Sequence, residues 1–142
     1  MMRRLILALL ITVGVSLSQE GMSKYYLVER VFLMPFVFKY ADELGIDESQ
    51  ISKIKEFVKS NEREVERNKK ILEYLNRKAK LMILEGREEK EVKEVLSDIA
   101  SVKMEMSLSN AKSVRFLKST LTPDQFERLK NIVVVRLFEL QP

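Results

Sequence analysis

The chain has 142 residues, of which 46% are hydrophobic and 32% charged, and its formal net charge is +4. This length fits one domain with one hydrophobic core. The sequence contains no histidine and no cysteine, which excludes a histidine general base, a thiol nucleophile, a disulfide and a Cys/His zinc site. The small net charge, with basic and acidic residues intermixed, gives no indication of nucleic-acid binding.

The N-terminal segment has the pattern of a secretory signal peptide. Two arginines precede an apolar run over residues 5–17, and small residues stand at Ser16 and Ser18. A run of about 13 apolar residues is short against the roughly 20 that span a bilayer. We therefore expect a signal peptide over residues 1–18, cleaved after Ser18, and a periplasmic domain over residues 19–142 without stable membrane insertion. An uncleaved membrane anchor is the alternative.

The first expected helix is short and lies in an aromatic segment. It covers about residues 34–44, with Pro35 in its first turn and Gly45 as its C-terminal stop. Residues 25–40 contain more aromatic side chains than one short helix needs for docking. This surplus indicates either a binding surface or a contribution to the core or to a dimer contact.

The second expected helix is the longest and runs from about Glu48 to Glu85, before Gly86. At about 1.5 Å per residue it extends about 55 Å. Side chains recur along it at alternating steps of three and four residues, which is the pattern of a coiled-coil stripe that needs a long partner. The stripe consists of Ile51, Ile54, Val58, Asn61, Val65, Asn68, Leu72, Leu75, Ala79 and Met82.

The third expected helix runs from about Glu88 to Ser119 and continues the same alternation. Its stripe consists of Val92, Val95, Ile99, Val102 and Met106. The short break at Gly86 favours an antiparallel hairpin in which the numbers of facing residues sum to about 172. Asn61 then faces a polar layer, which either fixes the register or marks a groove between splayed helices. The layer contains Ser107, Ser109, Asn110 and Ser113.

The fourth expected helix runs from Pro123 to about Glu139 and begins in the sequence LTPDQ. Thr122 is suited to cap this helix, and Gln125 can reach back to the cap. The sequence IDESQ at residues 46–50 repeats the device with Asp47 and Gln50. Ile46 and Leu121 precede the two caps as hydrophobic staples.

Two such motifs, 75 residues apart and on either side of a helical hairpin, resemble the Spy/CpxP family of periplasmic proteins, which carry paired LTxxQ motifs. Leu121, Thr122 and Gln125 match the second motif. In the first, Ile46 and Asp47 replace Leu and Thr, and Gln50 is kept. The resemblance covers essentially all of residues 19–142.

This resemblance implies an all-α fold of four helices with a long antiparallel hairpin, in a cradle-like antiparallel homodimer. It also implies an ATP-independent holding chaperone of the stress response that binds unfolded proteins and needs no cofactor. Related proteins that bind heavy metals rely on histidine, which this chain lacks, and we expect no metal site.

Client binding on such a protein needs apolar surface beyond what a narrow helical fold buries. The candidates are aromatic and aliphatic residues of the first two helices, together with cations that can speed capture. They are Phe32, Met34, Phe36, Phe38, Phe57, Tyr74, Leu81, Lys70, Arg77 and Lys78. Ile71 and the methionines Met82, Met104 and Met106 can extend this surface. Core packing is the alternative for each of them.

The alternative function is a periplasmic adaptor that responds to stress or metal and binds a sensor or regulator protein, such as a membrane sensor. We expect no enzyme, because the sequence has no Gly-rich phosphate loop, nucleophile elbow or metal-ligand motif.

Overall fold

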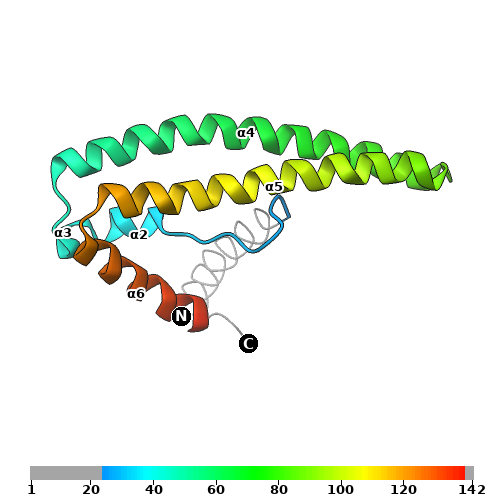
Figure 1. Cartoon of the computed structure of the whole chain (residues 1–142). Coiled ribbons are helices and arrows are strands. Elements are labelled where there is room, and N and C mark those ends of the chain that lie inside the picture. The colour runs from blue at the N-terminus through cyan, green and yellow to red at the C-terminus, as the bar shows by residue number, and fades with distance from the viewer. Residues whose placement is uncertain (1–23, 140–142) are drawn as a thin grey trace, which may run out of the picture. The chain divides into compact units, whose positions relative to one another are not determined.

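The computed structural model describes residues 24–139, and the expected signal peptide lies outside this range. All regular secondary structure in residues 24–139 is helical (Figure 1). The helices are α2 (Met34–Lys39), α3 (Ala41–Leu44), α4 (Glu48–Leu84), α5 (Glu89–Thr120) and α6 (Pro123–Glu139). The expected all-α fold with two long helices is therefore confirmed.

The expected single helix over residues 34–44 is wrong, because Tyr40 separates α2 from α3. The described residues accordingly form five helical segments rather than four. Tyr40 has φ −110° and ψ 19°, outside the helical range, although neither glycine nor proline stands there. Both short helices contact α6, and we attribute the break to this packing.

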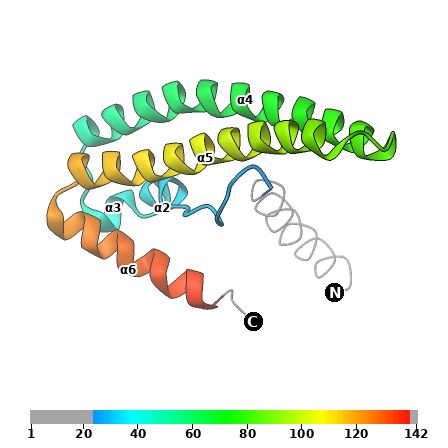
Figure 2. The ribbon, with the colours of Figure 1, turned by 45° about the vertical axis from the view of Figure 1, so that its right-hand side comes forward.

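The chain divides into two compact units, and α4 and α5 contribute to both. Of the described residues, unit 1 contains residues 24–30 and 69–107. Unit 2 contains residues 31–68 and 108–139. In each unit a stretch of α4 lies beside a stretch of α5, as both views show (Figures 1 and 2).

Those residues of the two apolar stripes that belong to unit 1 form its core. Within it Leu72 and Met106 are fully buried, and Val95 is 4% exposed. All residues of the two expected stripes are buried or partly buried. The step pattern therefore correctly identified the faces that α4 and α5 turn toward each other.

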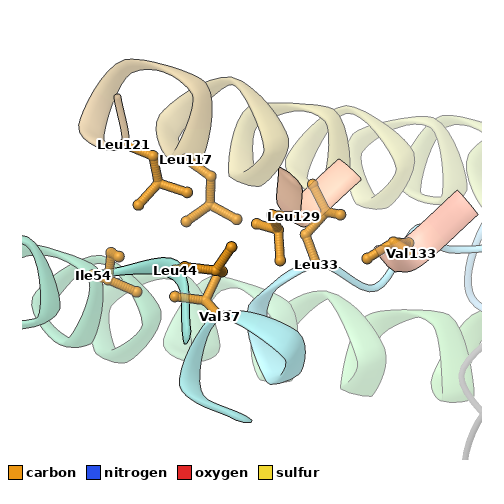
Figure 3. Close-up of a cluster of buried hydrophobic side chains, with 8 residues drawn as sticks. All are labelled: Leu33, Val37, Leu44, Ile54, Leu117, Leu121, Leu129 and Val133. Carbon is orange, nitrogen blue, oxygen red and sulfur yellow. The ribbon is translucent and has the colours of Figure 1, made fainter. Parts of the chain in front are cut away.

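The core of unit 2 joins α2, α3 and α6 to the ends of the long helices. Figure 3 shows how these side chains converge. The cluster consists of Leu33, Val37, Leu44, Ile54, Leu117, Leu121, Leu129 and Val133. Leu121, the expected staple of the second motif, belongs to this core, and Ile46 packs against it partly buried.

Both expected capping boxes are present in unit 2. The backbone N–H of Gln50 donates to Asp47 Oδ1 at 2.8 Å, and the N–H of Asp47 donates to Gln50 Oε1 at 3.0 Å. Gln125 and Thr122 make the same reciprocal pair, at 3.2 and 2.9 Å. These four backbone–side-chain bonds confirm the structural role predicted for the repeated motif.

The two motif glutamines also bind each other. Gln50 Nε2 lies 2.8 Å from Gln125 Oε1, and Gln125 Nε2 lies 3.4 Å from Gln50 Oε1. Each Nε2 also donates to a carbonyl two residues before the other cap: Gln50 to Thr120 at 3.2 Å, and Gln125 to Gly45 at 2.9 Å. We call this arrangement the glutamine clasp, and it joins the starts of α4 and α6 symmetrically.

The polar layer of unit 2 is bridged directly by hydrogen bonds. The hydroxyl of Ser109 donates to Asn61 Oδ1 at 3.0 Å, and Asn61 Nδ2 lies 3.5 Å from Ser113 Oγ. Asn110 instead pairs with both backbone groups of Val31, at 2.9 Å each. The contacts of Asn61 favour the register interpretation of this layer over an open groove.

Candidate functional site

The sequence-predicted surface residues divide between the two units. In unit 2, Met34 and Phe36 pack partly buried against the core cluster, and Phe32 is partly buried. Phe38 is 41% exposed. Phe57 stacks on Phe116 of α5 with ring centroids 4.1 Å apart. Phe32 and Phe36 are therefore partly covered within unit 2, and Phe38 is the more exposed aromatic residue of this segment.

The predicted residues of unit 1 lie on the solvent side of α4. Tyr74 and Leu81 are each 57% exposed, and Ile71 is 40% exposed. With Lys78 they follow steps of three, four and three residues, which places all four on one helix face. The cations Lys70 and Arg77 are exposed beside them. We call these six residues the α4 outer face.

Acidic side chains lie next to this face. An open depression of about 500 Å³ in unit 1 is lined by Lys78, Leu81, Met82, Glu85, Arg87, Glu91, Glu94, Val95 and Asp98. Its four carboxylates outnumber its two cations. On α4, cations thus lie beside the exposed apolar residues, whereas α5 supplies negative charge at the adjoining depression.

Arg87 is held at the rim of this depression by carboxylates. Its Nε donates to Glu85 at 2.9 Å, and its Nη1 lies 3.8 Å from Glu91. The hydrogen bond with Glu85 and the charges of both carboxylates raise the pKa of Arg87 above its usual value. This cation is thus engaged within the chain, whereas Lys78 has no ion pair among the salt bridges of the described residues.

Sequence reasoning missed several exposed apolar residues of unit 1. Ile83 and Leu84, at the end of α4, are 60% and 82% exposed, and Leu96 on α5 is 48% exposed. Met104 is exposed as expected, but Met106 is fully buried in the core. The sequence did contain a signal for the exposure of Leu96. Like Met104, Leu96 falls outside the three-and-four steps of the α5 stripe.

Residues 24–139 contain no helix that is long and apolar enough to cross a membrane. Within the same range no cluster of three or more acidic side chains is arranged to hold a metal ion. Comparison of the chain with protein-family models, with curated proteins and with solved structures finds no match.

Proposed function

We propose that the protein is an ATP-independent holding chaperone of the periplasm that binds unfolded proteins on the α4 outer face. The observation that carries this proposal is the exposure of Tyr74, Leu81 and Ile71 on one helix face beside Lys70, Arg77 and Lys78. The paired LTxxQ-like motifs and their similarity to the Spy/CpxP family support the same function. Such holding requires neither a cofactor nor catalytic chemistry.

The residues of the α4 outer face are suited to weak, reversible binding of clients. Burying one aromatic or aliphatic side chain fully contributes about 1.5–3 kcal/mol, so two or three partly covered residues hold a client weakly. Micromolar affinity corresponds to about 8 kcal/mol, which this face alone does not reach. Flexible cations add attraction for acidic segments and speed encounter. A client can therefore be captured quickly and released without an energy source.

We further propose that the active form is an antiparallel homodimer. The exposed apolar residues of unit 1 favour association, because isolated helical hairpins leave apolar side chains in water. A dimer also doubles the number of weak contacts available to one unfolded client, which raises overall affinity without a stronger individual site.

The test is suppression of client aggregation without nucleotide, followed by light scattering. The protein is purified after export from a bacterial host that expresses the full chain. The wild type should suppress scattering, with saturation near one dimer per client. The double substitution Tyr74→Ser with Leu81→Ser should weaken client affinity by about tenfold or more, because two apolar contacts are lost.

The matched control is Leu108→Ser with Val135→Ser. These residues are 59% and 56% exposed, like the tested pair, but belong to unit 2. Equal loss in both double variants would refute a role specific to the α4 outer face. No suppression by the wild type for several clients would instead favour the adaptor function, with one folded partner.

A further inference from the structure

Residues 24–30 of unit 1 have no helix or strand, yet they include two of its most buried side chains. Tyr25 is 5% exposed and Tyr26 is 6% exposed. The segment is the blue trace beside α5 in Figure 2. We call it the strap. Because it lacks a backbone ladder, contacts with side chains of the long helices attach it.

The ring and the hydroxyl of Tyr25 contact two residues of α4. The hydroxyl donates to Glu73 Oε1 at 2.8 Å, and Lys69 Nζ lies 5.4 Å from the ring centroid. Lys69 and Glu73 are four residues apart and therefore share a helix face. These two contacts favour tyrosine over phenylalanine. The tyrosine hydroxyl donates to the carboxylate and its ring contacts the cation, whereas phenylalanine can make only the ring contact.

The third contact, on α5, is made to the backbone of the strap. The N–H of Leu27 donates to Ser107 Oγ at 3.0 Å. The Leu27 and Val28 side chains are 52% and 72% exposed. Every residue except proline has this N–H, so the contact sets almost no sequence requirement. The arrangement therefore recognises Tyr25 together with the backbone N–H two residues after it.

We propose that Lys69, Glu73 and Ser107 form a binding site for tyrosine-containing polypeptide segments, which the strap occupies in the resting protein and an unfolded client displaces. This inference rests on the proposed function and names a tyrosine-containing segment as the client feature that unit 1 recognises. The strap is part of the same chain, so its effective concentration at the site is high. Free peptides should therefore bind poorly until the strap is released.

The test uses the full chain with Tyr25→Ser and Tyr26→Ser, which removes the strap's anchors and leaves Lys69, Glu73 and Ser107 in place. The probe is a fluorescent peptide with the sequence of residues 24–30, KYYLVER, followed by anisotropy. It should bind the released variant at least about tenfold more tightly than the wild type. Glu73→Ala with Ser107→Ala, added to the released variant, should abolish this gain, because neither side chain then has an oxygen to accept the peptide's hydrogen bonds.

Two changes to the peptide separate the contacts. Tyr25→Phe in the peptide should weaken binding several-fold, because the hydroxyl bond to Glu73 is lost. Replacing Leu27 and Val28 of the peptide with alanine should leave its affinity unchanged. Equal, weak binding of the parent peptide to the wild type and to the released variant would overturn the proposal.

Circular dichroism checks that the released variant keeps its helices. If it unfolds, the milder variant Tyr25→Phe takes its place, with a gain of several-fold expected and no gain overturning the proposal. Aggregation assays separate the two proposals. Peptide binding without suppression of aggregation would leave the site standing and contradict the chaperone function. Suppression by the wild type, without peptide binding by the released variant, would support the chaperone function and contradict the peptide-binding site.

Discussion

At the scale of residues, the glutamine clasp explains why both motifs end in Gln. A capping box accepts Glu as well as Gln at this position, because only an acceptor oxygen is needed. In this chain Gln50 and Gln125 also donate through Nε2, to each other and to the carbonyls of Thr120 and Gly45. A carboxylate has no N–H to donate, so the contact between the motifs requires the amide.

A double-mutant cycle tests the clasp. Gln125 is 7% exposed, and Gln125→Ala should lower the free energy of unfolding by about 2 kcal/mol, because buried acceptors lose their donor. Gln50→Ala should cost somewhat less. The losses in unfolding free energy of the two single variants should sum to more than the loss in the double variant, since the two amides share hydrogen-bond partners. Urea unfolding followed by circular dichroism measures this, and strict additivity would contradict the clasp.

Tyr26 gives the strap a pH dependence. Burial raises the pKa of its phenol above the ordinary value of 10.0, against a smaller opposing effect of the Arg30 charge. The unfolded chain therefore ionises first, and the stability that Tyr26 provides is complete below about pH 10 and is lost as pH rises through the folded-state pKa.

Unfolding measured from about pH 9 to about pH 11.5 checks this. Tyr26→Phe should lose less stability over that interval than the wild type. Tyr74→Phe is the control for the loss of an exposed tyrosine hydroxyl, because Tyr74 is 57% exposed. Equal losses in all three proteins would contradict the burial of the Tyr26 hydroxyl.

At the scale of elements, glycines set where helices end. Gly86 ends α4 with φ +67°. Its N–H bonds Ile83 O at 3.1 Å, and the N–H of Arg87 bonds Met82 O at 3.0 Å. This pair of bonds is a Schellman motif. Gly45 ends α3 with the same φ and the same pair of bonds, to Asp42 and Ala41.

Gly86→Ala should lower the free energy of unfolding by about 1 kcal/mol, because a β-carbon opposes the left-handed conformation. A β-carbon at Gly86 would have no heavy atom within 4 Å, so the cost comes from the backbone alone. Gly86→Asn should cost less, since Asn tolerates this conformation. Urea unfolding compares the three proteins. An alanine variant as stable as the wild type would be inconsistent with the positive φ.

Local chemistry made much of the fold predictable. Both caps, both glycine stops and both apolar stripes depend on residues within one or two helical turns, which periodicity and capping rules capture. The break at Tyr40 was not predictable, because neither glycine nor proline stands there to indicate it. The glutamine clasp joins residues 75 positions apart. Its signal was available, since the expected hairpin register places Gln50 opposite Thr122.

The candidate site was only partly predictable, for the same reason. Spacing along α4 correctly put Tyr74 and Leu81 outside the stripe and in solvent. The aromatic residues near the N-terminus have no comparable pattern, and long-range packing decides their exposure. Phe36 thus packs against the unit 2 core while Phe38 stays exposed.

At the scale of the whole molecule, unit 1 has more of the exposed large apolar side chains in the described residues than unit 2. Those of unit 1 are Leu27, Val28, Ile71, Tyr74, Leu81, Ile83, Leu84, Leu96 and Met104, and those of unit 2 are Val31, Phe38, Leu108, Val134 and Val135. Unit 2 contains the glutamine clasp and the cluster drawn in Figure 3. This distribution favours different roles for the two units, in which unit 2 stabilises the ends of the long helices and unit 1 provides the proposed binding surface.

The most direct test of the central claim is site-specific photocrosslinking. A benzophenone amino acid replaces Tyr74 in one protein and Val135 in another, two positions with 57% and 56% exposure in different units. Each protein is irradiated with a client in its unfolded form and in its folded form. We predict crosslinks from position 74 to the unfolded client only, and few from position 135. Equal crosslinking from both positions, or none from position 74, would contradict the assignment of the α4 outer face as the client surface.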